Sequence, residues 1–311
     1  MTAPPDIVPD SQYRGMLSML PPFARDLALL ARFDRPIGWW LLFWPCAWGV
    51  FLAGGTARWG IVAWMLLGAI AMRGAGCVYN DIVDADLDAR VARTAMRPVA
   101  SGAVSKKAAW VWLLALCGVG LIVLLQLRWE AQAVALGSLG LVAAYPFMKR
   151  ITGWPQAWLG LVFTWGAPVG WIEVNGLARP PSLGLAPLAA LYAGCWAWCM
   201  AYDTIYALQD REDDAMVGIG SSALSFGTHV RAGVIGLYAM ALACWASAVW
   251  LVRPDALALL ALLPVGAHFA WQALTLDTAD GSSALARFRS NRFAGALMAA
   301  ACFVVGAAAQ G

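Results

Sequence analysis

The sequence predicts an all-α, polytopic membrane protein with about nine transmembrane helices. Two observations carry this prediction: 61% of the 311 residues are hydrophobic, and only 13% are charged. A soluble domain carries about a quarter charged residues, so this chain has too little polar surface to stay dispersed in water. A soluble enzyme, a disordered protein and a nucleic-acid-binding module are therefore excluded, and the lipid bilayer is the expected surrounding.

Stretches of roughly 20 apolar residues, long enough to cross a bilayer as a helix, recur along the chain. They lie at about 36–55, 59–79, 107–126, 131–148, 155–174, 185–206, 231–251, 255–275 and 292–310. Proline interrupts several of them, as membrane helices tolerate when neighbouring groups satisfy the freed backbone; these prolines are Pro45, Pro168, Pro187 and Pro264. We interpret residues 1–35 as a tail followed by an interfacial helix, and residues 36–311 as the nine-helix domain.

The distribution of basic residues predicts an orientation. Most of the 21 Lys and Arg residues lie in the N-terminal tail and in the loops after the even-numbered predicted helices. Such loops stay on the cytoplasmic side, so the N-terminus and the loops on its side are expected there. The tail lacks the plan of a cleaved signal peptide, and Asp6 and Asp10 argue against an organelle transit peptide. The expected location is therefore the bacterial inner (cytoplasmic) membrane.

Half of the 18 acidic residues lie in two short segments after the second and sixth predicted helices, and hence on the same side of the membrane. At 100° per residue each segment places three carboxylates on one helical face. These are Asp81, Asp84 and Asp88 with Asn80 beside them, and Asp203, Asp210 and Asp214 with Tyr206 beside them. Two such faces repel each other unless a cation lies between them, and Mg²⁺ prefers carboxylate oxygens and bridges to phosphate. The alternative is a pair of solvated loops with incidental acids.

Basic residues on the same side indicate a phosphate ligand. Arg93 and Arg97 lie four residues apart after the first acidic segment and can fork onto phosphate oxygens. Lys149 and Arg150 end the fourth predicted helix. Acids that hold a metal and bases that hold oxygens are the parts of a metal-assisted diphosphate site. For each basic residue alone, orientation by the positive-inside rule is the alternative, and it is strongest for Arg150.

Arg73 lies inside an otherwise apolar predicted helix, where a charge is costly and usually faces a cavity or a partner. Its spacing from Asn80 and Asp84 places the three residues on one face, with Arg73 deeper in the membrane. An isolated cation at that depth suits an anionic substrate group such as a carboxylate. The alternative is an internal salt bridge.

These motifs resemble those of the UbiA-type intramembrane prenyltransferases. The first matches N-D-x-x-D-x-x-x-D, from Asn80 to Asp88, and continues as R-T-x-x-R-P, from Arg93 to Pro98. The second matches D-x-x-Y-x-x-x-D-x-x-x-D over residues 203–214. Segments at 34–38, 72–77, 145–150 and 154–156 are similar to the branch of the family that prenylates 4-hydroxybenzoate in ubiquinone biosynthesis.

The resemblance covers roughly residues 30–310 and implies a helix bundle around a central cavity, with Mg²⁺ held by both acidic motifs at its mouth. It implies transfer of a polyprenyl group from polyprenyl diphosphate to the ring carbon ortho to the hydroxyl of 4-hydroxybenzoate. With the spacing, it assigns the metal to Asp81, Asp84, Asp88, Asp203, Asp210 and Asp214, the diphosphate to Asn80, Arg93, Arg97 and Lys149, and the aromatic carboxylate to Arg73. Arg73, Asn80, Asp84 and Asp210 are the residues expected to be catalytic.

Three alternatives stay open at this point. Other members of the same family use haem, chlorophyllide, homogentisate or naphthoate as acceptors. The CDP-alcohol phosphotransferases also pair aspartates, but their D-G-x-x-A-R opening is missing, since Ala89 follows Asp88. A cation-coupled membrane transporter would bind near the bilayer midplane, whereas the acids here cluster at one side. One departure from the family pattern is Gly218–Ser221, which lacks the basic residue that relatives usually carry there.

Overall fold

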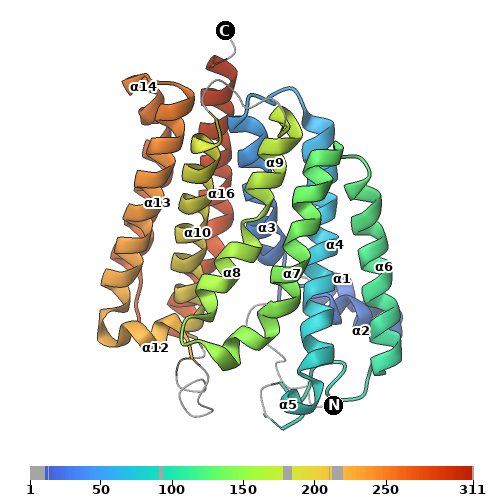
Figure 1. The fold of residues 1–311 in the computed structure, drawn as a ribbon. Helices are drawn as coiled ribbons and strands as arrows, with labels where there is room; N and C mark the ends of the chain where they lie inside the picture. The colour runs from blue at the N-terminus through green and yellow to red at the C-terminus, as the bar shows by residue number, and fades with distance from the viewer. Residues whose placement is uncertain are drawn as a thin grey trace. The chain divides into compact units, whose positions relative to one another are not determined.

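The computed structural model describes residues 11–12, 14–90, 94–177, 184–209, 211 and 220–309, and Figure 1 shows their helices. All regular secondary structure in these ranges is helical, which confirms the predicted all-α fold. The chain forms two compact units. The first combines residues 1–39 with 66–124, and the second combines residues 40–65 with 125–311.

The first unit is built on two antiparallel helices. It contains α1 (Arg14–Leu17), α2 (Pro22–Leu30), most of α4 (Trp59–Val83), α5 (Ala85–Asp88) and α6 (Lys106–Leu124). Its core forms where apolar residues three, four or seven apart on α4 and α6 face each other; these are Ala75, Val78 and Ile82 with Ala109, Leu113 and Leu116. Leu30 joins this core, and Trp112 of α6 donates from Nε1 to the carbonyl oxygen of Leu27, 3.1 Å away. The end of α2 is thereby fixed to the unit.

The second unit is organised around α10 (Ala186–Ala207). Its other elements are most of α3 (Ile37–Leu52), α7 (Trp129–Ile151), α8 (Pro155–Phe163), α9 (Gly166–Asn175), α12 (Ser222–Phe226), η1 (Gly227–His229), α13 (Val230–Val252), α14 (Ala256–Leu259), η2 (Leu260–Leu262), α15 (Leu263–Thr275) and α16 (Gly281–Ala308). Helix α10 packs against α8, α9, α13 and α16, and α13 runs beside it in Figure 1. Gly194 of α10 lies against the indole of Trp245 of α13, so α10 and α13 approach closely.

Proline interrupts two of the predicted stretches. The stretch at 155–174 is two helices, because Pro168 offers no N–H to the carbonyl of Thr164 and its ring crowds that carbonyl. The hydroxyl of Thr164 donates back to the carbonyl oxygen of Gly160 at 2.8 Å, which favours a break at this point. The stretch at 255–275 passes through the 3₁₀ turn η2 directly before Pro264 for the same reason.

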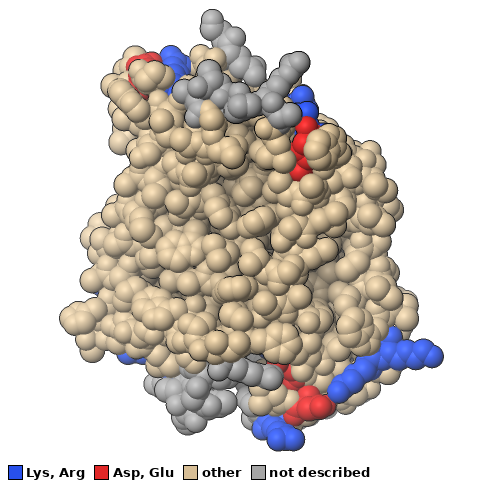
Figure 2. Space-filling model, in the orientation of Figure 1, with Lys and Arg blue, Asp and Glu red and all other residues tan. Residues whose placement is uncertain are grey.

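Six helical segments in the described ranges are long and apolar enough to cross a membrane. They are Trp59–Val83, Lys106–Leu124, Trp129–Met148, Ser222–Val252, Ala256–Thr275 and Gly281–Ala308. Figure 2 shows that charged side chains on the visible face lie near the ends of the helices and that the surface along their middle is uncharged. The protein is therefore a polytopic membrane protein. The count of nine crossings, the placement of α2 at the interface and the boundary at residue 35 stay predictions.

Candidate active site

Three polar residues lie four positions apart where α4 ends and α5 begins. The N–H of Asp84 donates to the carbonyl oxygen of Asn80 at 2.9 Å, and the N–H of Asp88 donates to that of Asp84 at 2.8 Å. These two hydrogen bonds span Asp84, the residue between α4 and α5, whose φ of −93° and ψ of 3° depart from the helical values. Backbone hydrogen bonds thus link Asn80, Asp84 and Asp88 in four-residue steps across the junction of α4 and α5, and we refer to these three residues as the strip.

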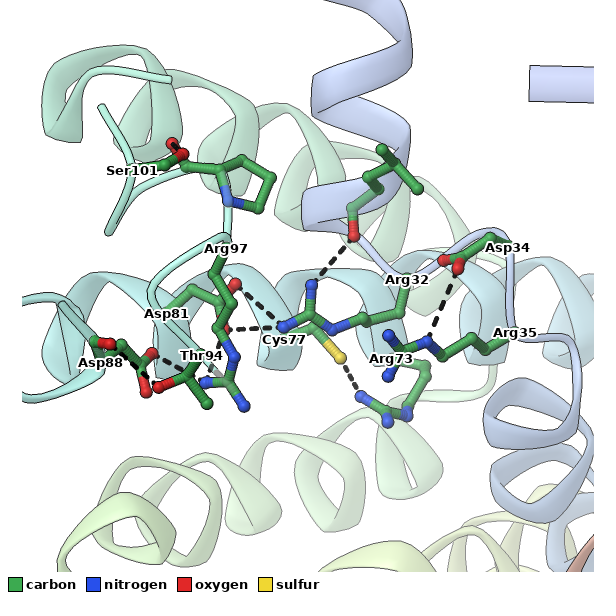
Figure 3. Close-up of polar contacts among 12 residues, drawn as sticks. Arg32, Asp34, Arg35, Arg73, Cys77, Asp81, Asp88, Thr94, Arg97 and Ser101 are labelled. Atoms are coloured by element: carbon green, nitrogen blue, oxygen red, sulfur yellow. Dashed lines mark hydrogen bonds and ion pairs between the residues drawn. The ribbon is translucent and has the colours of Figure 1, made fainter. Parts of the chain in front are cut away.

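Two arginines neutralise the buried carboxylates of Asp81, beside this strip, and Asp88, at its end (Figure 3). Arg32 Nη2 lies 3.0 Å from each carboxylate oxygen of Asp81. Arg97 Nη1 lies 3.3 Å from Asp81 Oδ1 and 2.7 Å from Asp88 Oδ2. The two aspartates are only 2% and 6% exposed, and buried charges are tolerated only when they are paired. Asp81 and Asp88 are thus members of one ion-pair network with Arg32 and Arg97.

The segment after α5 positions Arg97. The hydroxyl of Thr94 donates to the carbonyl oxygen of Asp88 at 2.9 Å, and Val99 and Val104 are buried in the core of the first unit. Arg97 is therefore carried by a loop that is attached to α5 at one end and to the core at the other. Arg93, the other predicted diphosphate ligand of this loop, lies outside the described residues.

An acidic residue of α5 points away from this network. Asp86 is exposed and pairs with Lys106 Nζ at 2.9 Å. The hydrogen bond from Lys106 and its positive charge lower the pKa of Asp86. This surface pair contributes little to stability, so Asp86 supplies a matched control for the acids of the strip.

Arg73 lies on α4 two turns before Asn80. Its Nη1 contacts the sulfur of Cys77 one turn further along the helix. Its guanidinium also lies over Gly38, because a Cβ at Gly38 would be only 2.7 Å from Arg73 Nε. The half-buried arginine is therefore held between its own helix and the first turn of α3.

The second acidic motif is described only in part. Asp203 and Tyr206 lie in the last turns of α10, where both are half-buried, and the Tyr206 ring packs on Phe288 with centroids 4.5 Å apart. Asp210 and Asp214 lie outside the described residues, and of Lys149 only its place in α7 is described. The meeting of the two acidic motifs therefore stays a prediction.

The donor chemistry of the strip fits a hard divalent cation. Within the described residues, no three His, Cys, Asp or Glu side chains are grouped closely enough to hold a metal ion. Asn80, Asp84 and Asp88 nevertheless offer amide and carboxylate oxygens on one strip, and these are the ligands that Mg²⁺ accepts while it keeps several waters. A complete site would need oxygens from the second motif or from a phosphate.

The largest aromatic cluster belongs to the core of the second unit. The ring centroids of Trp48 and Trp198 are 4.9 Å apart, those of Trp48 and Trp245 are 5.2 Å apart, and those of Trp198 and Tyr202 are 4.9 Å apart. All four side chains are less than 2% exposed. Because their faces are covered by one another, these rings stabilise helix packing and do not line an open surface.

Sequence reasoning missed three residues of the site. Thr94 and Gly38 lie inside the segments at 93–98 and 34–38 that carry the family resemblance, but the sequence assigns neither residue a role. Arg32 was counted only as one basic residue of the N-terminal tail. Its contact with Asp81 joins residues 49 positions apart, and a local sequence pattern does not predict such a contact.

The fold and the site define a class: a polytopic helical membrane protein with an acid and arginine network at the end of a transmembrane helix. Comparison with known proteins makes this class specific. The sequence profile of the UbiA prenyltransferase family matches residues 42–298. The chain belongs to this family, which confirms the resemblance inferred from its motifs.

Individual relatives agree with this assignment. A Drosophila melanogaster protein named 4-hydroxybenzoate polyprenyltransferase, mitochondrial, is 42% identical over 278 residues, which cover 88% of this chain and 70% of the relative. An Arabidopsis thaliana protein of the same name is 38% identical over 284 residues, which cover 90% of this chain and 68% of the relative. These names match the activity that the motifs predict.

Solved structures share the fold. A UbiA homolog from Aeropyrum pernix K1, solved in the apo form, superposes with a TM-score of 0.67 at 24% identity, covering 85% of this chain and 97% of that one. A UbiA homolog from Archaeoglobus fulgidus, bound to GPP and Mg²⁺, gives a TM-score of 0.63 at 17% identity, covering 90% and 99%. At these identities the likeness shows the fold alone.

The predicted location in a bacterial inner membrane is wrong. The relatives from fly, Caenorhabditis elegans, Arabidopsis thaliana and rat are all named as mitochondrial proteins, which points to a mitochondrial membrane. The physical reason for the error is that basic loops report which loops share a side of a membrane. They carry no information on which membrane that is.

Proposed function

We propose that this protein transfers a polyprenyl group from polyprenyl diphosphate to the ring carbon ortho to the hydroxyl of 4-hydroxybenzoate. The observation that carries the proposal is the 37–42% identity, over most of the chain, to enzymes that bear this name. The position of Arg73, half-buried within α4, supports an aromatic acid as the acceptor. A guanidinium at this position can bind a substrate carboxylate through two parallel hydrogen bonds.

The strip at the end of α4 and the second acidic motif would hold Mg²⁺. The ligands expected from the sequence are Asp81, Asp84, Asp88, Asp203, Asp210 and Asp214, of which Asp81 is bound by Arg32 and Arg97 in the structure. When bound, Mg²⁺ supplies positive charge that stabilises the departing diphosphate. The chain's own contribution is to fix carboxylate oxygens on two helix ends, so that the diphosphate meets a preformed set of charges.

The basic residues of the same side would bind the diphosphate oxygens. Arg97 is carried by the loop that Thr94 attaches to α5, and its planar guanidinium can donate two parallel hydrogen bonds to one phosphate group. Arg93 and Lys149 add charge, and the amide of Asn80 adds a neutral donor beside Asp84. Together these groups favour heterolysis of the allylic C–O bond, because they bind the leaving group more tightly as its charge grows.

Arg73 would orient the acceptor. With the substrate carboxylate held by this guanidinium, the ring is placed at a fixed depth along α4 relative to the diphosphate. The ring carbon beside the hydroxyl then attacks the allylic carbon, and loss of the ring proton restores aromaticity. Water must be kept away while the allylic cation exists, since capture by water would give an alcohol.

The proposal is tested by an acceptor panel. Purified protein in detergent is incubated with Mg²⁺, polyprenyl diphosphates of several chain lengths, and 4-hydroxybenzoate, homogentisate or a naphthoate. We expect prenylated 4-hydroxybenzoate and no turnover when the metal is omitted. Asp84→Ala should abolish turnover, and Asp86→Asn, which changes an exposed acid of the same segment, should not.

Two results contradict the proposal. If homogentisate or a naphthoate were prenylated and 4-hydroxybenzoate were not, the acceptor would be a different compound. Near-normal turnover by Asp84→Ala would remove the metal assignment.

A further inference from the structure

Arg32 has an unusual backbone. Its φ of +58° is the only positive φ of a non-glycine residue in the described part of the chain. Helix α2 ends there in a closing motif, with the N–H of Phe33 donating to the carbonyl oxygen of Ala28 and the N–H of Arg32 to that of Leu29, both at 3.0 Å. Glycine normally occupies this left-handed position, because a Cβ there is sterically costly. An arginine at this position therefore calls for a compensating interaction.

The side chain of Arg32 supplies that interaction. Nη1 donates to the carbonyl oxygen of Leu29 at 3.0 Å, and Nη2 lies 3.0 Å from both carboxylate oxygens of Asp81. The Arg32 side chain is 13% exposed and that of Asp81 is 3% exposed, so the pair is shielded from water. The left-handed backbone thus aims the guanidinium from the end of α2 onto α4.

The pair is connected to the predicted metal ligands. Asp81 also accepts from Arg97, and the same Nη1 of Arg97 binds Asp88 at 2.7 Å. A chain of alternating charges therefore runs from Arg32 through Asp81 and Arg97 to Asp88, and Figure 3 shows it across α4. Both oxygens of Asp81 are already engaged by guanidinium groups.

We propose that Arg32 is a positioning residue of the transferase. Its partner Asp81 binds Arg32 and Arg97 and does not bind the metal. This inference rests on the proposed function of the site. Arg32 fixes Asp81, and Asp81 restrains Arg97 between two carboxylates, so the orientation of Asp88 is set from the N-terminal segment. The effect on the reaction passes through Arg97 and Asp88, and Arg32 itself does not contact the substrates.

The decisive variant is Arg32→Gly, because glycine suits the left-handed backbone and preserves the end of α2. If Arg32 only closed the helix, this variant would melt at the same or a higher temperature and keep full activity. We expect the melting temperature to fall, because the buried Asp81 loses one of its two arginine partners, kcat to fall about tenfold, and the KM for polyprenyl diphosphate to rise. Arg32→Lys should recover part of the lost activity, since lysine restores the positive charge but not the planar group that binds both carboxylate oxygens.

Asp81 is tested through its coupling to Arg32. Asp81→Asn should reproduce Arg32→Gly, and the double variant should be no worse than either single variant, because the two residues act as one unit. Hydrogen exchange gives a readout other than activity: amides of α5 should exchange faster in both single variants. Arg25→Gln, on the exposed side of α2, is the control and should leave both readouts unchanged.

The results that would contradict the role of Arg32 differ from those that would contradict the proposed function. Full activity in Arg32→Gly would remove the positioning role. Asp81 would be a metal ligand if Asp81→Asn needed much more Mg²⁺ than Arg32→Gly. The same conclusion would follow if the losses of activity were additive in the double variant. Asp84→Asn is measured in parallel. Its retained activity would instead remove the proposed metal site, whatever Arg32 does.

Discussion

Gly38, at the start of α3, lies against the guanidinium of Arg73: a Cβ on this glycine would be 2.7 Å from Nε and 3.4 Å from Cζ. Such a Cβ would force the arginine to move. The missing side chain at position 38 therefore lets the helix start and the predicted carboxylate-binding arginine approach each other closely.

Gly38→Ala should consequently weaken acceptor binding. Displacing Arg73 misplaces the substrate carboxylate, so we expect the KM for 4-hydroxybenzoate to rise about tenfold, which corresponds to about 1.4 kcal/mol. The KM for polyprenyl diphosphate should stay close to that of the wild type. Gly118→Ala on α6, where a Cβ meets no atom within 4 Å, is the control. Equal acceptor KM values in the two variants would show that Gly38 makes no room that Arg73 needs.

Asn291 joins three helices of the second unit through buried hydrogen bonds. It accepts from Trp198 Nε1 at 2.8 Å, donates to Gln272 Oε1 at 3.4 Å, and is fully buried. Asn291→Leu leaves the indole N–H without its partner, and we expect a loss of about 2 kcal/mol in the free energy of unfolding. Thermal melting in detergent measures it, with exposed Ser247→Ala as a neutral control. A melting temperature equal to that of the control would count against this network.

Helices α3 and α9 cross at small residues. A Cβ at Gly49 would lie 2.8 Å from the backbone N of Trp171, and one at Gly170 would lie 2.9 Å from that of Val50. Backbone atoms cannot rotate away, so Gly49→Ala and Gly170→Ala should each cost about 2 kcal/mol by forcing the helices apart. Gly140→Ala on α7, with open space at its Cβ, should melt no lower than the wild type. Unchanged melting of all three variants would contradict the close crossing.

Asp280 caps the N-terminus of α16 and gives this region a pH dependence. The hydroxyl of Ser282 and the backbone N–H groups of Ser282 and Ser283 donate to its carboxylate and lower its pKa. A carboxyl with a lowered folded pKa stabilises the fold above its unfolded pKa, and this stability is lost as the pH falls through the folded pKa. Asp280→Ala should therefore melt below the wild type at pH 7.

The difference between Asp280→Ala and the wild type should shrink as the pH falls toward 3. Asp280→Asn keeps a neutral cap and should lose less at pH 7. A gap between the alanine variant and the wild type that is as wide in acid as at neutral pH would show that ionisation of Asp280 plays no part.

The positions of the helices were predictable because long apolar runs follow directly from the thickness of the bilayer. Their ends and breaks were not. Helix α16 begins at Gly281 rather than near 292, since its first turns are polar and a hydropathy pattern detects only the apolar part. Pro45 and Pro146 stay inside continuous helices, whereas α8 and α9 separate before Pro168. Whether a proline breaks a helix depends on which neighbours satisfy the freed carbonyl, and that is a tertiary property.

The candidate site divides in the same way. Helical periodicity predicts Asp81, Asp84 and Asp88 on one face with Asn80 beside it, because that relation is local. It gave no reason to separate Asp81 from the metal ligands. The separation that we propose rests on Arg32, whose left-handed backbone and distant position in the chain are properties of the fold.

We propose that the two acidic motifs jointly hold Mg²⁺ on the diphosphate. Binding of a nonreactive analogue, in which sulfur replaces the bridging oxygen of the allylic diphosphate, tests it without turnover. We predict tight binding only with Mg²⁺, loss of that binding in both Asp84→Asn and Asp210→Asn, and wild-type binding in Asp86→Asn. Mg²⁺-dependent binding that survives either of the first two substitutions would show that the two motifs do not share the metal.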